Sequence, residues 1–222
     1  MHTREELLAC VVARLIGEAK HVAIGAASPI PATACELLRA RGQNLRVSMH
    51  QKRKGNPLTE GSRELFDLAG QGRIDVFFLG GAQIDGAANI NLVRAEGRRF
   101  PGSFGSAFMY PMVPRTILFR EEHSRRTLVP RVEFVSAAGS PQALLTGKAL
   151  FSWQKDRRCF RLESVHPGHT LEEVRQETGF DFDFQEVTTT KEPSGEELAL
   201  LRGPVANAIR ADYPDFAKKV WG

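Results

Sequence analysis

Residues 76–92 read VFFLGGAQIDGAANINL, and this stretch decides the fold class of the chain. It opens with a short apolar run that ends on the glycine pair Gly80-Gly81. A near-continuous apolar run is typical of a parallel-sheet strand that is covered on both faces. A turn with glycine, amide and carboxylate side chains follows the run. Ligands in open α/β sheets bind beyond the carboxyl ends of the strands, so this turn is the first candidate site.

Helical and strand patterns alternate on both sides of this stretch. Thr3 and Glu6 form a capping box before an apolar helical period, which predicts a helix over residues 4–18. Similar patterns predict strands at 21–25, 44–50, 74–79, 114–119, 132–135, 142–145 and 159–163, and helices at 31–41, at 62–68, from 170 to about 178 and from 194. The alternation predicts a single α/β domain over residues 1–222, with an open, mostly parallel sheet flanked by helices and a C-terminal helical segment from about 194.

Composition narrows the class of protein. Hydrophobic residues make up 42% of the chain and charged residues 25%, which excludes disorder as the main state. No apolar run approaches the ~20 residues of a membrane span, and the N-terminus does not resemble a secretory signal. We therefore expect a cytoplasmic protein with no membrane partner. The odd number and wide spacing of the cysteines suit neither a disulfide framework nor a zinc site, so buried, inert thiols are expected at Cys10, Cys35 and Cys159.

The net charge of +4 comes from scattered basic clusters at 51–54, 98–99, 125–126 and 157–158. None of these clusters is interleaved with aromatic residues, so no nucleic-acid partner is expected. Two interpretations remain for them. They lie in solvated loops, or they form a surface that attracts an anionic ligand such as a phosphorylated cofactor.

The turn after the apolar run carries the first set of candidate binding residues. The backbone N–H groups of Gly80 and Gly81 could bind a thioester oxygen or a phosphate. Buried amides and carboxylates must be satisfied, so four such side chains in one turn predict a polar network that orders the site, at Gln83, Asp85, Asn89 and Asn91. An alternative for Asp85 is that it caps its own turn.

A second loop reads FPGSFG over residues 100–105 and adds Gly102, Ser103 and Gly105 as candidates. A serine nucleophile needs a nearby base and a strand-turn-helix elbow, and the sequence indicates neither. We expect Ser103 to position a ligand or shape the loop.

Histidines offer acid–base chemistry because the imidazole pKa lies near ~6.5. His50 follows a predicted strand and is the histidine best placed for function. His166 and His169 flank a Pro-Gly turn before a capped helix, and His-x-x-His alone is a weak metal signal, so no metal site is expected.

Three motifs in order resemble the β-subunit of family I coenzyme A-transferases, and most closely the glutaconate CoA-transferase group. They are GGAQIDGAANIN at 80–91, FPGSFG at 100–105 and ESVHPGHTLEEVR at 163–175. The resemblance implies a CoA-transferase (NagB/RpiA-like) fold and a separate α-subunit, usually in an α2β2 assembly with the active site at the subunit junction. It also implies an acyl-CoA substrate, with coenzyme A as part of that substrate and no tightly bound cofactor.

The sequence departs from this family at the catalytic glutamate. In the transferases that glutamate lies in a Ser-Glu-Asn-Gly-type motif, whereas residues 47–51 read VSMHQ here, which places Met49 at the glutamate position. A thioether cannot form the acyl anhydride that CoA transfer requires. His50 and Glu60, the nearest later carboxylate, are therefore the catalytic candidates. Phe104 also stands where the family loop has a glycine.

These observations predict the β-subunit of an enzyme that acts on an acyl-CoA thioester and transfers CoA between carboxylic acids. Two alternatives remain open. One is a ring-opening acyl-CoA hydrolase related to enzymes of steroid degradation, which lack the glutamate. The other is a non-catalytic scaffold or CoA-binding subunit.

Overall fold

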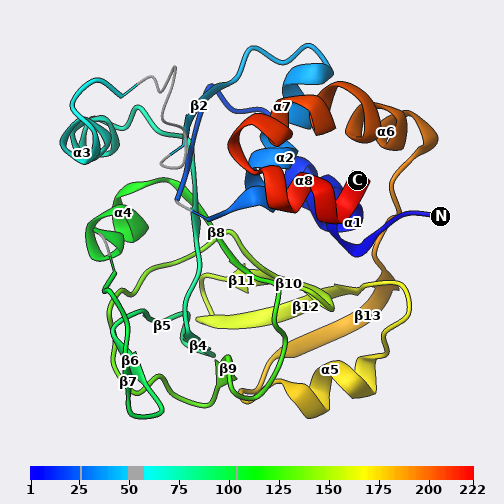
Figure 1. The fold of residues 1–222 in the computed structure, drawn as a ribbon. Helices are drawn as coiled ribbons and strands as arrows, with labels where there is room; N and C mark the ends of the chain where they lie inside the picture. Colours follow the sequence, from blue (N-terminus) through cyan, green and yellow to red (C-terminus); the bar gives the residue numbers. More distant parts are fainter. Residues whose placement is uncertain (26, 50–57, 104) are drawn as a thin grey trace. The chain divides into compact units, whose positions relative to one another are not determined.

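The computed structural model in Figure 1 describes residues 1–25, 27–49, 58–103 and 105–222. The chain forms two compact units. Unit 1 contains residues 1–78 and 191–222, and unit 2 contains residues 79–190. The single domain expected over 1–222 stays a prediction.

The sheet of unit 1 is parallel, as its apolar strands predict. The strands β2 (Arg46–Met49), β1 (His21–Ile24) and β3 (Val76–Leu79) lie side by side in this order. Every residue of β1 and β3 is buried, which explains why these strands lack an apolar–polar alternation. The Asp75 carboxylate accepts from the backbone N–H groups of Lys20 at 2.6 Å and His21 at 2.9 Å, and so ties the starts of β1 and β3 together.

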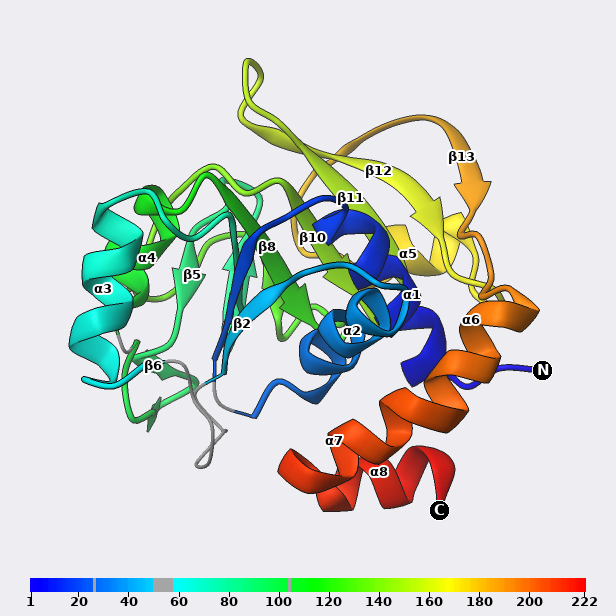
Figure 2. The same ribbon diagram turned by 90° about the horizontal axis from the view of Figure 1, so that it is seen from above.

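Helices α1 (Arg4–Ile16), α2 (Pro29–Ala40) and α3 (Ser62–Gly70) complete the N-terminal part of unit 1. The capping box of Thr3 and Glu6 forms as predicted. The last part of the chain is helical, with α6 (Gly195–Leu200), the π-helical turn η1 (Leu201–Val205), α7 (Ala206–Asp212) and α8 (Pro214–Trp221). Figure 2 shows α6, α7 and α8 in succession along the C-terminal segment, in orange to red.

The C-terminal helices attach to α1 through a buried carboxylate. Glu6 accepts from Arg202 Nε at 2.7 Å and from Trp221 Nε1 at 3.2 Å. Burial alone would raise the pKa of Glu6, but these hydrogen bonds and the Thr3 backbone bond together lower it. The charged form of Glu6 is thus the form that this packing requires.

The main strands of unit 2 form a mixed arrangement. Their order is β8 (Arg115–Arg120), β10 (Ala143–Thr146), β11 (Ala149–Gln154), β12 (Cys159–Val165) and β13 (Asp183–Thr189). The pairs β8–β10 and β12–β13 are parallel, while β10–β11 and β11–β12 are antiparallel. Helix α5 (Leu171–Glu177) lies in the connection from β12 to β13. With the parallel strands of unit 1, this confirms an α/β fold whose sheet strands are mostly parallel.

Short elements surround the candidate loops of unit 2. A small sheet has the order β5 (Ile90–Asn91), β4 (Gln83–Asp85) and β9 (Leu128–Val129). The strands β6 (Arg94–Ala95) and β7 (Arg98–Arg99) form a separate hairpin, and α4 (Ser106–Met112) follows it. An aromatic core supports the larger strands, with ring centroids 5.2 Å apart for Phe151 and Phe182 and 4.9 Å apart for Trp153 and Phe160.

One predicted strand was wrong, and several elements were not predicted. Residues 132–135 do not form a strand, because side chains satisfy their backbone N–H groups: Val132 donates to Asp85 and Glu133 donates to Gln83. The elements not predicted are β4–β7, β9, β11, β13 and α4. In the part of the chain that the structure describes, no helix has the length and apolar character needed to cross a membrane.

Candidate functional site

Backbone packing leaves little room for a side chain at either position of the pair after β3. A Cβ atom on Gly81 would lie 2.7 Å from the Gln83 carbonyl oxygen, far inside normal contact. A Cβ on Gly80 would lie 3.1 Å from the Phe119 carbonyl oxygen. Neither glycine has a positive φ, so close approach of backbone, and not an unusual conformation, explains the residue type. The binding role of their N–H groups stays a prediction.

The expected polar network of the turn is present. The Gln83 side chain is 5% exposed; its Nε2 donates to Glu133 at 2.9 Å, and its Oε1 accepts from Asn91 Nδ2 at 2.9 Å. The Asn91 amide also donates to the Arg94 carbonyl at 2.6 Å. The polar atoms of Gln83 are therefore occupied by protein partners, and this side chain fixes the shape of the turn.

Asp85 caps its own turn, which was the alternative left open for it. One carboxylate oxygen accepts from the backbone N–H groups of Ala87 and Asn89, each at 3.0 Å. The other accepts from the Asn89 amide and from the Val132 N–H, each at 3.2 Å. Asp85 is 2% exposed, and its hydrogen bonds hold in place the turn of residues 80–91, which we call the glycine turn.

The second candidate loop leads into α4. Gly102 is exposed with φ of 114°, and Gly105 has φ of 60° directly before the helix, so both positions use the conformational freedom of glycine. Ser103 is half-buried, and its carbonyl accepts from the Ser106 N–H at 2.9 Å. Phe104 lies outside the described residues. The loop-shaping role expected of Ser103 agrees with this turn, while its contact with a ligand stays a prediction.

His166 is a buried structural residue of the turn between β12 and α5. Its Nε2 donates to the Thr146 carbonyl at 3.0 Å, so Nδ1, at 2.8 Å from the Thr190 hydroxyl, is the acceptor. Burial lowers the pKa of His166 to about 4, and the ring is neutral at physiological pH. The contacts of His166 therefore favour a structural turn over a metal site for the His-Pro-Gly-His motif at residues 166–169.

His123 is buried in the same way, although charged residues flank it in the sequence. Its ring nitrogens lie 2.8 Å from the Thr146 hydroxyl and 3.0 Å from the Thr178 hydroxyl. Burial lowers the pKa of His123 to about 4. Local sequence could not reveal this, because Thr146 and Thr178 come from distant segments.

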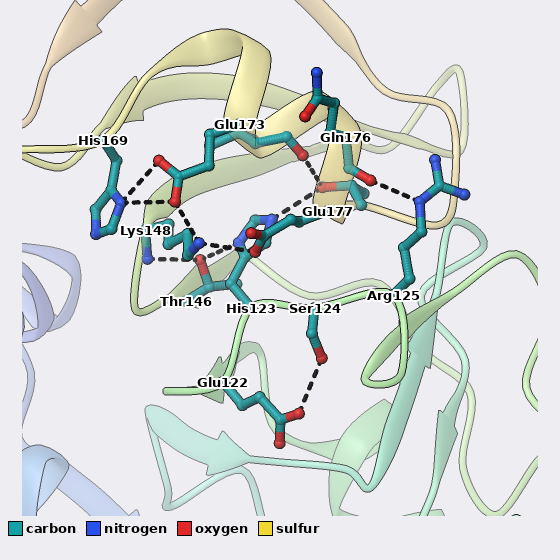
Figure 3. Close-up of polar contacts among 12 residues, drawn as sticks. Glu122, His123, Ser124, Arg125, Thr146, Lys148, His169, Glu173, Gln176 and Glu177 are labelled. Carbon is teal, nitrogen blue, oxygen red and sulfur yellow. Dashed lines mark hydrogen bonds and ion pairs between the residues drawn. The ribbon is translucent and has the colours of Figure 1, made fainter.

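A charged cluster holds α5 against the turn between β10 and β11 (Figure 3). The Lys148 ammonium contacts Glu173 and lies 2.8 Å from the Glu177 carboxylate, and His169 Nδ1 lies 3.0 Å from Glu173. The Lys148 hydrogen bond, followed by that of His169, lowers the pKa of Glu173 to about 2. In the sequence, the i,i+4 spacing of Glu173 and Glu177 places both carboxylates on one face of a helix, and this spacing could have predicted the cluster. Among the described residues, no three or more His, Cys, Asp or Glu side chains gather as metal ligands do.

The catalytic candidates lie in unit 1. Met49 ends β2, is 2% exposed and pairs with Ile24 of β1. Glu60 is exposed, and its carboxylate lies 4.0 Å from Arg63. His50 lies outside the described residues. The catalytic roles of His50 and Glu60 stay predictions.

Two of the three cysteines are fully buried, as expected. Burial raises the pKa of Cys10 to about 12 and raises that of Cys35 further above its usual range. Such thiols are unreactive because the nucleophile is the thiolate. The expectation of a buried thiol was wrong for Cys159, which is half-buried at the start of β12 and donates to Asp183 at 3.3 Å.

Comparison with curated proteins finds three informative relatives. The chain is 30% identical over 162 residues to the B-type subunit of 3-oxoadipate CoA-transferase from Pseudomonas knackmussii, and the match covers 63% of this chain and 62% of that protein. The B-type subunit of glutaconate CoA-transferase from Acidaminococcus fermentans is 25% identical, with 57% and 55% covered. The cholesterol ring-cleaving hydrolase IpdB subunit of Rhodococcus jostii is 27% identical, with 63% and 62% covered. The matched segment thus spans less than two thirds of each relative.

Solved structures give the same fold. The decarboxylase AibA/AibB matches with a TM-score of 0.83 and 25% identity, and all of both chains is covered. Glutaconate coenzyme A-transferase from Acidaminococcus fermentans matches in fold with a TM-score of 0.79, 19% identity, and 91% and 94% of the chains covered. The model of the coenzyme A transferase family matches residues 10–176, which include the glycine turn, the second loop and the turn before α5. This chain is therefore a member of the coenzyme A transferase family.

Proposed function

We propose that this chain is the B-type subunit of an enzyme that acts on an acyl-CoA thioester together with a separate partner subunit, and that it transfers CoA between carboxylic acids. The observation that carries the proposal is the family match over residues 10–176. Two relatives, each named as the B-type subunit of a CoA-transferase, support the reaction and the need for a partner. CoA enters as part of the substrate.

In this proposal the glycine turn binds the thioester carbonyl through the N–H groups of Gly80 and Gly81. Hydrogen-bond donors lower a reaction barrier most when they are held in place before the substrate arrives. Gln83 and Asp85 supply this rigidity, because their side chains are buried and bonded within the protein. Gly102, Ser103 and Gly105 form a wall of the same site.

CoA transfer needs a carboxylate that attacks the thioester carbonyl and expels the CoA thiolate, leaving a mixed anhydride. The thiolate then attacks the carbonyl of the enzyme carboxyl group, releases the first acid and forms an enzyme thioester. The acceptor acid reverses these steps. Met49 cannot supply the carboxylate, so we assign this role to Glu60, with His50 as the acid or base.

A second candidate is hydrolysis of a carbon–carbon bond in a ring-bearing acyl-CoA. The buried thioether of Met49 at the end of β2 favours it, since this reaction needs no carboxylate at that position. The 27% identity to the cholesterol ring-cleaving hydrolase IpdB subunit also supports it. In this case a base-activated water adds to a ring carbonyl and the adjacent carbon–carbon bond breaks, giving a carboxylate and a carbanion that takes up a proton, while CoA stays attached to the substrate.

The test is a turnover assay of the chain with the subunit that co-purifies with it. A panel of acyl-CoA donors and carboxylate acceptors is analysed by mass spectrometry for new acyl-CoA and for ring-opened product. Transfer predicts new acyl-CoA that Glu60→Gln lowers at least ~100-fold and that the exposed control Glu196→Gln leaves unchanged. Ring-opened product without new acyl-CoA selects the hydrolase. If the partner alone is equally active, this chain is a scaffold and both proposals are wrong.

A further inference from the structure

The hairpin of β6 and β7 places arginines directly opposite one another. Its two turn residues, Glu96 and Gly97, have φ of 51° and 72°, which is the geometry of a tight two-residue hairpin. The register pairs Arg94 with Arg99 across the two strands. Like charges in facing positions destabilise a hairpin, so a positive pair here has an energetic cost.

This hairpin forms one side of a cleft within unit 2. The cleft has a volume of about 620 Å³, inside the usual range for small-molecule sites, and is lined by Val93, Arg94, Gly97, Arg98, Arg99, Glu133 and Phe134. Among the residues that the structure describes, none of these three arginines has a carboxylate within ion-pair distance. The cleft therefore presents net positive charge, because its lining holds three arginines and one carboxylate, that of Glu133.

The acid among the lining residues, Glu133, is occupied by other partners. Its Oε1 accepts from Gln83 Nε2 at 2.9 Å and from the Glu96 N–H at 3.0 Å. Next to it, Phe134 is 42% exposed. Guanidinium groups bind phosphate in a two-point geometry, and an exposed aromatic face can stack on a base.

The same hydrogen bonds join the cleft to the glycine turn. Asn91 donates to Gln83 and to the Arg94 carbonyl, and its Oδ1 accepts from the Val93 N–H at 3.1 Å. Glu133 bridges Gln83 on the turn to Glu96 on the hairpin. These contacts, which range from the buried Asn91–Gln83 bond to the exposed Glu96–Glu133 bond, hold the two features in place relative to each other.

We propose that this cleft binds the nucleotide end of coenzyme A, with Arg94, Arg98 and Arg99 on its 3′-phosphate and 5′-diphosphate and Phe134 against the adenine. This inference rests on the proposed function, because it places the far end of the acyl-CoA whose thioester the glycine turn receives. Under this proposal the basic cluster at residues 98–99 binds an anionic ligand, which is one of the two interpretations that the sequence left open for the basic clusters.

The test measures binding of 3′-phosphoadenosine 5′-phosphate, a probe without thioester, to the 222-residue chain by calorimetry. Each of Arg94→Gln and Arg99→Gln is expected to weaken binding about tenfold, the loss of one charge-assisted contact. Phe134→Leu is expected to weaken it about fivefold by removing the stacking face. Arg158→Gln, an exposed arginine in the same unit, is the matched control and leaves binding unchanged.

The outcomes separate this inference from the proposed function. A wild-type chain that gives no binding heat at millimolar probe overturns the inference, and so do arginine variants that bind as well as the control. Inorganic diphosphate that binds as tightly as the nucleotide overturns the role of the base. None of these results affects turnover by the wild-type protein, which tests the proposed function separately. Support requires weaker probe binding together with a higher KM for acyl-CoA at unchanged kcat, and thermal unfolding at the wild-type temperature shows that the variants are folded.

Discussion

Alanine at Gly81 is expected to distort the turn on which the proposed site depends. The new Cβ would lie 2.7 Å from the Gln83 carbonyl oxygen, and ordinary contact begins at 3.4 Å, so the backbone must separate by about 0.7 Å. Overpacking of this kind costs about 1–3 kcal/mol of folding free energy. Because the clash is with backbone, no side-chain rotation relieves it.

The same displacement acts on function. A shift of reacting groups by about 1 Å can lower turnover ~100-fold, so Gly81→Ala is expected to lose most of its acyl-CoA activity. The Cβ of Gly80→Ala would lie 3.1 Å from the Phe119 carbonyl oxygen, so this variant is expected to lose less folding free energy and less turnover than Gly81→Ala.

Urea unfolding and turnover of three variants test this reasoning. The control is Gly195→Ala at the start of α6, where a Cβ meets nothing within 4 Å. This control should retain activity and unfold at an equal or slightly higher urea concentration, since alanine favours helix. If Gly81→Ala matches Gly195→Ala in both assays, the close approach at Gly81 does not constrain the turn and the argument is refuted.

Two further predictions concern stability. His123 and His166 have pKa values lowered to about 4, below the 6.5 of the unfolded chain, so stability is complete above pH 6.5 and falls as the pH drops toward 4. At pH 5 each histidine is expected to remove about 2 kcal/mol, and equal urea midpoints at pH 7.5 and pH 5 would contradict this. Arg202→Gln is expected to lower the urea midpoint because the buried Glu6 carboxylate loses its charged partner. Its matched control in urea unfolding is Arg210→Gln on α7, whose guanidinium donates to the Asn207 side chain at 3.0 Å; equal losses in both variants would exclude a special role for the Glu6 pair.

Local sequence patterns located most of the regular elements. The capping box of Thr3 and Glu6 correctly predicted the start of α1, and the helices predicted from 170 and from 194 begin at the capping residues Thr170 and Ser194, because a cap depends only on residues within one turn. The strands β1, β2, β3, β8, β10 and β12 were found from apolar runs or from apolar–polar alternation. The short strands β4 to β7 were not, since two or three residues carry too little periodicity.

The features of the candidate site also divide into those that the sequence predicted and those that needed the structure. Sequence alone determined the glycine turn, the second loop and the resemblance to CoA-transferases, because these are contiguous motifs. Only the tertiary structure decided that Gln83 and Asp85 face inward, since their partners Glu133 and Val132 lie far along the chain. It also decided that His123 and His166 are neutral, and that the arginines of residues 94–99 line one cleft. Burial and long-range hydrogen bonds set the charge and orientation of a side chain, and neither can be read from its neighbours in sequence.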